Sequence, residues 1–262
     1  MATHKTGIIG FFDILGYQSF LDNNAEGDTK AVEVVLESLL AMPKQCSDHF
    51  EETFGKVEKN FGNGNELVKR ISNEIQSLIF SDTILLTCPY GAEENDETKL
   101  VRWLIFNYRA ATLQRKMFDS GLPVRGAISH GDYILAESCF AGRSIIEAYR
   151  VCNQLDVAAV VLTESAKNEI AKRNKTCNPG EKLADVFSNI IVEYLMPMKG
   201  LITERLYTIN FAFLEAPPFL SLEGDERKLV SDCFWKHNKD IPPGIYDKLN
   251  NTEMLLRFLK RV

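Results

Sequence analysis

The hydrophobic pattern at the start of the chain changes from strand-like to helix-like spacing. Residues 8–15 form a short apolar run around one carboxylate, Asp13, which is typical of a buried strand. Residues 29–41 carry apolar side chains at helical spacing, and Asp28 or Thr29 is available as the N-cap. The pattern therefore predicts a strand that leads into a helix.

The next segment separates that helix from a predicted hairpin. Residues 43–76 are polar and charged and are interrupted by the run FGNGNE at 61–66, so we expect a surface insertion of helix, turn and helix. In residues 78–87, two short apolar runs flank Ser81 and Asp82, which predicts a β-hairpin with a carboxylate at its tip.

The rest of the pattern alternates between helices and strands and predicts an α+β protein with a ferredoxin-like mixed sheet, covered by helices on one side. The expected elements are a helix over 98–119, a strand pair at 124–131 and 133–138, a helix over 142–155, a strand over 158–163, a helix over 163–173, and strands over 190–195 and 206–211.

The C-terminal region differs from the rest. After Phe213, four prolines punctuate a charged helical segment whose last part, residues 251–260, is amphipathic. We expect one domain over residues 1–213, with 43–76 as its insertion, and a helical extension over 214–262 that packs on this domain or on a partner chain.

Composition narrows the function classes. The 262 residues are 45% hydrophobic, and no apolar run approaches the roughly 20 residues of a membrane span. The N-terminus lacks the features of a secretory signal, so a cytoplasmic protein is expected. A formal charge of −6 without a basic stripe argues against nucleic-acid binding. The six cysteines are scattered and indicate neither a zinc site nor a redox pair.

Two carboxylates carry the candidate chemistry. Asp13 ends a buried strand and Asp82 lies at a hairpin tip, so the two converge if their strands are neighbours. A bare carboxylate among apolar side chains costs several kcal/mol unless a cation or hydrogen-bond donors meet it. Mg²⁺ and Mn²⁺ are bound by a few carboxylates while substrate phosphates complete the shell. The pair suits nucleotidyl transfer with two metal ions.

Four stretches resemble the motifs of the class III nucleotidyl cyclases: F-x-D-x-x-G-F in the first strand, an Asp in a hairpin, R-x-G-I-x-x-G in a strand, and G-x-x-V-N-x-A-x-R in a helix. The resemblance covers roughly residues 8–211. Here the four stretches read FFDILGY at 11–17, FSDT at 80–83, RGAISHG at 125–131 and GRSIIEAYR at 142–150.

The resemblance implies roles for particular residues. Asp13 and Asp82 would bind two divalent ions, Mn²⁺ or Mg²⁺, with the backbone carbonyl of Ile14 as a further ligand. Arg150 would stabilise the α-phosphate in the transition state. The family places its active sites between two protomers, so a homodimer is implied and Arg150 would serve the partner's metals. Lys199 matches the lysine that binds the triphosphate.

This sequence departs from the family motifs at positions associated with recognition of the nucleotide's base and with the transition state. The purine-selecting position falls on Leu78, which offers no hydrogen bond to a purine edge, and the helix Asn is replaced by Ile146. The chain looks most like the pyrimidine cyclases of bacterial antiphage (Pycsar) systems, which make cyclic UMP or cyclic CMP and activate a separate effector. UTP or CTP is then the expected substrate. Cys139 matches a position where guanylate cyclases often have Cys, which leaves a purine cyclase open, and Ile146 leaves open a catalytically silent nucleotide-binding module.

Each of these residues also has a simpler interpretation. Asp13 alone is a plausible N-cap, Asp82 an ordinary turn residue, and Arg150 a surface ion-pair residue. Arg125 is expected to pair with a carboxylate in the strand layer. His130 and Asp132 suggest a general base, but Gly-Asp is routine in the turn expected after the strand that ends at 131.

Overall fold

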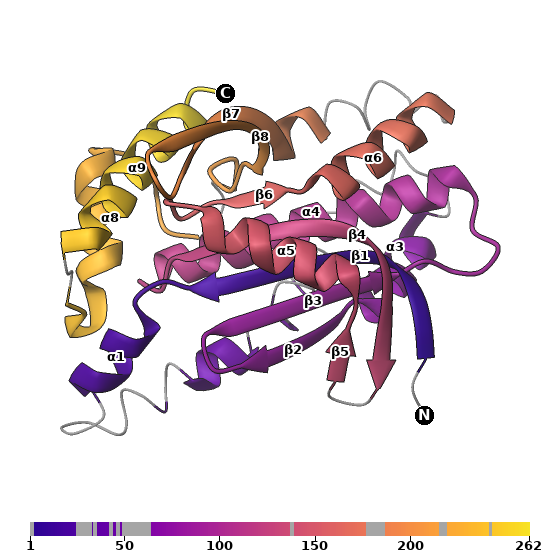
Figure 1. Ribbon diagram of the computed structural model, residues 1–262, viewed down its shortest axis with the longest axis horizontal. Helices are drawn as coiled ribbons and strands as arrows, with labels where there is room; N and C mark the ends of the chain where they lie inside the picture. The colour runs from indigo at the N-terminus through magenta and orange to yellow at the C-terminus, as the bar shows by residue number, and fades with distance from the viewer. Residues whose placement is uncertain are drawn as a thin grey trace.

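The chain forms one mixed sheet with helices on both faces (Figure 1). The computed structural model describes residues 3–24, 33, 36–41, 44–45, 48, 64–136, 139–176, 187–214, 219–240 and 243–262. The strands are β1 (Thr3–Ile14), β2 (Gln76–Phe80), β3 (Thr83–Pro89), β4 (Val124–Ala136), β5 (Cys139–Ala141), β6 (Val160–Leu162), β7 (Ile191–Met198) and β8 (Ile202–Ile209). The helices are α1 (Tyr17–Asn24), α3 (Gly64–Glu74), α4 (Asp96–Asp119), α5 (Arg143–Gln154), α6 (Glu164–Thr176), α8 (Glu226–Trp235), the 3₁₀ turn η2 (Lys236–Asn238) and α9 (Pro243–Leu259).

The strand order is β2-β3-β1-β4-β6-β8-β7, and β5 pairs with the far end of β4. The pair β4–β6 is parallel, while β1 is antiparallel to both of its neighbours. The predicted α+β mixed sheet is therefore confirmed. The expectation of helices on one side is wrong, because α5 packs on β1 and β4 from the second face.

Alternation along β1 separates the two faces of the sheet. Ile8 and Phe12 are fully buried in the large core that includes α4, whereas Ile9 belongs to a small cluster on the other face. Phe11 also packs against that second cluster. Asp13 follows in the same alternation, so its side chain belongs to the face that α5 covers.

One predicted strand pair is a single strand. The structure shows no turn at 131–132, and β4 pairs with β1 without interruption from Thr3 opposite Leu135 to Ile14 opposite Val124. Gly131 has a φ of 153°, a conformation that glycine tolerates, so the strand continues through it. The Gly-Asp sequence was misread because its turn propensity is overridden by pairing with β1.

The N-terminal helices also differ from expectation. The helix α1 (Tyr17–Asn24) was not predicted, and residues 36–41 are helical while the rest of the expected helix at 29–41 lies mostly outside the described residues. Of the insertion at 43–76, the structure shows α3, after which β2 begins at Gln76. Most of the remaining insertion lies outside the described part of the chain.

The C-terminal helices α8 and α9 pack on the sheet of their own chain. Buried side chains of α8 and α9, including Phe234 and Leu256, share one hydrophobic cluster with Ala127 and Val161 of the sheet. Figure 1 shows α8, α9 and α1 together at the end of the sheet where β1 ends. Within the described ranges, no helix is both long and apolar enough to cross a membrane.

Candidate active site

Asp13 and Asp82 lie at the ends of neighbouring strands. Asp13 is opposite Thr83 in the β1–β3 register, and the amide of Ile14 donates to the carbonyl of Asp82 at 2.8 Å. The hairpin predicted around Asp82 is confirmed, with Ser81 taking the left-handed φ of 54° in its turn. The structure thus brings together the two carboxylates, which are 69 positions apart in the sequence.

Arg125 is the protein partner of Asp13. The two residues face each other across β1 and β4, and Nε of Arg125 lies 2.7 Å from Oδ2 of Asp13. Its terminal nitrogens donate to Oδ1 of Asn153 at 3.1 Å and to the carbonyl of Leu155 at 3.4 Å. The prediction that Arg125 pairs with a carboxylate is confirmed. Asp13 lies within β1 and α1 begins only at Tyr17, so Asp13 is not the N-cap of α1.

The electrostatics of Asp13 favour a cation. Burial raises the pKa of its carboxyl; the charge of Arg125 and its hydrogen bond lower that pKa in part, and the nearby charge of Asp82 raises it again. The ionised form of Asp13 is therefore disfavoured even with Arg125 beside it, and a further cation would stabilise it. Hard carboxylate oxygens are the ligands that Mg²⁺ and Mn²⁺ prefer, so the donor set fits these ions.

The protein supplies only part of a metal coordination shell. Among the residues that the structure describes, no group of three or more His, Cys, Asp or Glu is placed to hold a metal. The two aspartates therefore need further oxygen ligands from the backbone, from water or from a substrate. Substrate phosphates characteristically complete such a shell in magnesium sites.

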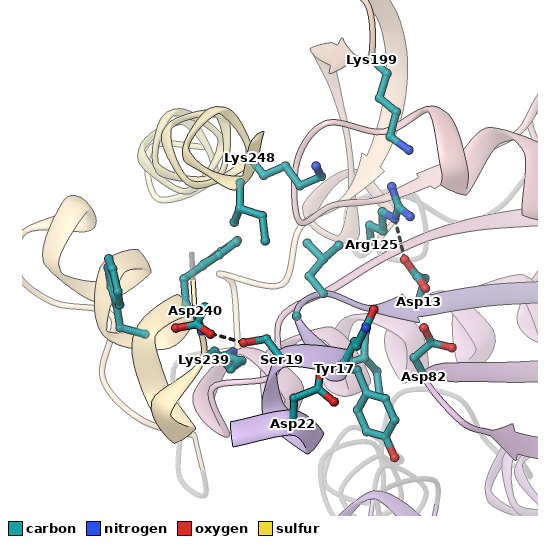
Figure 2. A pocket seen from close by; sticks show the side chains of 17 residues that line it. Asp13, Tyr17, Ser19, Asp22, Asp82, Arg125, Lys199, Lys239, Asp240 and Lys248 are labelled. Carbon is teal, nitrogen blue, oxygen red and sulfur yellow. Dashed lines mark hydrogen bonds and ion pairs between the residues drawn. The ribbon is translucent and has the colours of Figure 1, made fainter. Parts of the chain in front are cut away.

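A cavity of about 750 Å³ opens beside the two aspartates (Figure 2). Its volume is in the range of small-molecule sites. Positively charged side chains face the aspartates from three different elements: Arg125 from β4, Lys199 from the β7–β8 turn and Lys248 from α9. The C-terminal extension forms one wall through Phe234, Trp235, Lys239, Asp240, Ile245 and Lys248.

Lys199 lies on the cavity of its own chain. Its amide donates to the carbonyl of Gln154 at 2.7 Å, which ties the β7–β8 turn to the end of α5. Burial lowers the pKa of its amine, and the charges of Arg125 and Lys248 lower it further against the opposing effects of Asp156 and Asp13. A bound polyanion would therefore offset the repulsion between the amine of Lys199 and the neighbouring positive charges.

Arg150 and Ile146 lie away from this cavity. Both are exposed on α5, and the side chain of Ile146 is 50% exposed. Neither residue lines the cavity of its own chain.

The two residues expected near the base lie beyond the aspartates along the sheet. Leu78 pairs with Leu85 across β2 and β3 and packs, partly buried, on the cluster of Ile9 and Tyr133. The backbone of Cys139 begins β5, opposite Ala136, and its side chain lies outside the described part of the structure. Ile14 is buried and lines the cavity.

His130 and Asp132 belong to a different region. His130 pairs with Ile8, five positions along β4 from Arg125, and its ring lies 5.2 Å from that of Tyr90. Burial lowers the pKa of His130, and Asp132 accepts a hydrogen bond from the hydroxyl of Thr6. Neither residue lines the cavity of Asp13 and Asp82.

Sequence reasoning missed the contribution of the extension. Lys248 lies in α9, where the sequence shows only a charged amphipathic helix. Its presence opposite the aspartates depends on how α9 packs on the domain, for which the sequence carries no local signal.

Comparisons with known proteins give structural similarity only. No protein-family model and no curated protein matches the chain. Among solved structures, it is similar to the catalytic core of a rhodopsin-guanylyl cyclase with converted specificity in complex with ATPαS, with a TM-score of 0.45, 15% identity and coverage of 80% of this chain and 98% of that one. It is also similar to the adenylyl cyclase CyaB from P. aeruginosa, with a TM-score of 0.44, 12% identity and coverage of 84% and 100%. A class III adenylyl cyclase-like ATP-binding protein from Pseudomonas aeruginosa gives a TM-score of 0.42 and 15% identity, with coverage of 71% and 40%.

Proposed function

We propose that this protein is a metal-dependent nucleotidyl cyclase that converts a pyrimidine nucleoside triphosphate, UTP or CTP, into the 3′,5′-cyclic nucleotide and pyrophosphate. The observation that carries the proposal is the pairing of Asp13 with Asp82 at the edge of a cavity that is also lined by Arg125, the ion-pair partner of Asp13, and by Lys199. Carboxylates that could hold metal ions and side chains that could bind phosphates thus line one cavity, whose volume is in the range of small-molecule sites.

Asp13 and Asp82, with the carbonyl of Ile14, would hold the two divalent ions. When bound, such ions lower the pKa of an attacking hydroxyl and neutralise charge on departing phosphates. Arg125 takes Oδ2 of Asp13 in its hydrogen bond, which leaves Oδ1 for a metal and fixes the orientation of the carboxylate. Arg125 is therefore a positioning residue in this scheme.

The reaction is an intramolecular displacement. The 3′-oxygen of the ribose would form a bond to the α-phosphorus and lose its proton to solvent water, while the bond from the α-phosphorus to the bridging oxygen breaks and pyrophosphate is released. Lys199 would bind the departing phosphates, and Arg150 from the second protomer of a homodimer would stabilise the charge that develops on the α-phosphate. No covalent enzyme intermediate is required.

The choice of a pyrimidine rests on Leu78. Its side chain has no polar atom to read a purine edge, and its surroundings on β2 and β3 are apolar. By its resemblance to the Pycsar cyclases, the protein would act in the cytoplasm as a homodimer and signal in antiphage defence to a separate effector. Residues 1–213 would form the catalytic domain and 214–262 its extension.

The direct test is incubation of the purified protein with each of the four ribonucleoside triphosphates and Mn²⁺, followed by mass identification of the products. Cyclic UMP or cyclic CMP is expected. A cyclic purine nucleotide would show that the substrate is a purine nucleoside triphosphate, and the assignment as a cyclase would stand. If the folded dimer yields no cyclic nucleotide from any of the four, the enzyme assignment is wrong; nucleotide binding that persists would then favour a silent module, for which Ile146 already argues.

A further inference from the structure

Lys248 extends the cation set of the proposed active site. It lies on α9, in the C-terminal extension, and lines the same cavity as Asp13 and Asp82 (Figure 2). Its side chain is only 17% exposed. A lysine held at the wall of a cavity, opposite two aspartates, is placed to meet a ligand there.

The position of Lys248 is fixed by the loop between α5 and β6. Nζ of Lys248 lies 3.3 Å from Oδ1 of Asp156, and Asn251 donates to the carbonyl of Asp156 at 2.8 Å. The amide of Ala158 donates to the hydroxyl of Thr252 at 3.0 Å. Three polar contacts therefore anchor this part of α9.

The same segment of chain holds the other two cations. Lys199 donates its amide to the carbonyl of Gln154, and Arg125 donates to Leu155 and Asn153. Arg125, Lys199 and Lys248 thus depend on residues 153–158 for their placement. Contacts with the end of α5 and with the connection to β6 therefore help to place all three side chains.

Lys199 and Lys248 line the same cavity and lie close enough for their charges to interact. The charge of Lys248 acts on the amine of Lys199, and that of Arg125 acts on it as well. Asp156 is a partner of Lys248, while Arg125 is already engaged with Asp13. An anion with several charges, placed between the two lysines, would convert this repulsion into attraction.

We propose that Lys248 binds the β- and γ-phosphates of the nucleotide together with Lys199, so that the C-terminal extension completes the active site. This rests on the proposed function, since it assumes that the nucleotide's α-phosphate lies at Asp13 and Asp82. An alternative is that Lys248 only anchors α9 through its ion pair with Asp156.

Three variants separate these roles. Lys248→Met removes the charge and keeps most of the aliphatic stem. Asp156→Asn breaks the same ion pair and leaves the Lys248 charge in place. Lys228→Met, on α8, removes a lysine that is 73% exposed, and serves as the matched control. Lys248→Gln replaces the Met variant if that variant does not fold.

The readout is the binding of inorganic tripolyphosphate in the presence of Mn²⁺, measured by calorimetry, with thermal unfolding of each variant alongside. We expect Lys248→Met to weaken binding by about tenfold to a hundredfold, since it loses a charge-assisted contact. Asp156→Asn should bind at least as tightly as the parent, and Lys228→Met should bind as the parent does.

Equal weakening by Lys248→Met and Asp156→Asn would overturn the inference, because both changes break the ion pair. Parent-like binding by Lys248→Met would overturn it as well. If the parent makes a cyclic nucleotide, the proposed function stands whichever result is found for Lys248. If the parent binds no tripolyphosphate and makes no cyclic nucleotide, both proposals fail.

Discussion

The two ends of β1 treat charge in opposite ways. At the N-terminal end, Arg173 contacts both Glu169, at 2.6 Å, and Asp96, and the buried Arg102 contacts both Glu74 and Glu94. At the C-terminal end, Asp13 forms an ion pair with Arg125 and also lies within the electrostatic influence of Asp82. Each arginine at the first end contacts two carboxylates, whereas at the second end only Asp13 of the two aspartates has an ion-pair partner among the described contacts, and both aspartates line a cavity.

This difference separates charged residues that stabilise the fold from charged residues that indicate a ligand site. Arg102 is 1% exposed and is compensated by two carboxylates, as a buried charge must be for the fold to be stable. Asp13, Asp82, Lys199 and Lys248 line one cavity, and a metal and a polyphosphate bound there together would neutralise both kinds of charge. Incomplete compensation beside an open space therefore indicates a ligand site.

The largest effect is expected at the aspartates. Asp82→Asn should reduce turnover by at least about a thousandfold, because one metal ligand loses its charge. The variant should fold, and Mn²⁺ should no longer raise its unfolding temperature. Asp22→Asn, an exposed residue that lines the same cavity, is the control and should retain activity. Full activity of Asp82→Asn would remove Asp82 from the site.

At the N-terminal end of β1, the loss of a buried charge should lower the stability of the protein. Arg102→Met leaves Glu74 and Glu94 without their buried partner, so the free energy of unfolding should fall by about 3–5 kcal/mol in chemical denaturation. Arg70→Met, at a side chain that is 55% exposed and contacts the same Glu94, should change it by less than about 1 kcal/mol. Similar small losses in both variants would show that the charges around Arg102 are not compensated as described.

A variant of Arg150 tests whether the active site is shared between two protomers. Arg150→Ala should lower kcat by about a hundredfold with little change in KM, because its contact strengthens as charge develops on the α-phosphate. Mixing this variant with Asp13→Ala should restore activity through one complete site per heterodimer. A rise in KM alone, or no restoration in a mixed dimer, would contradict the assigned role.

A smaller effect concerns pH. Because burial raises the pKa of Asp13, its carboxyl takes up a proton at a higher pH than an ordinary aspartate, and a metal must displace that proton. The stabilisation by Mn²⁺ should therefore decline as pH falls, beginning above the ordinary value of about 3.9.

Without metal, the contribution of Asp13 to stability changes with pH in the opposite direction. A raised pKa in the folded state means that Asp13 contributes stability at low pH, which is lost as pH rises through the raised value. Thermal unfolding across pH, with Mn²⁺ and with chelator, should show the two opposite trends. A Mn²⁺ effect that is independent of pH would exclude Asp13 as a ligand.

The sequence predicted those parts of the site that depend on local patterns. The apolar run around Asp13 and the two runs around Asp82 predict strands, and the structure pairs those strands side by side. The contact of Arg125 with Asp13 was foreseen only as a contact with some carboxylate, because the register that joins residues 112 positions apart is a tertiary property.

The misreadings have a common cause. Gly131 and Asp132 have strong turn propensity, yet continuous pairing with β1 keeps them in one strand. Lys248 was not identified because its role depends on the docking of α9 against residues 156–158, which no periodicity encodes. Local propensity predicts elements, whereas long-range packing decides which side chains meet.

Asp13 and Asp82 are proposed to bind together the metal ions of a nucleotide site. The most direct measurement is the anomalous signal of manganese in crystals grown with Mn²⁺ and a non-reactive UTP analogue. We predict a peak roughly 2.1–2.3 Å from one carboxylate oxygen of each aspartate, consistent with the oxygen distances of hard divalent ions. A peak elsewhere, with Asp13 still bound only to Arg125, would show that the two aspartates do not hold the metal ions.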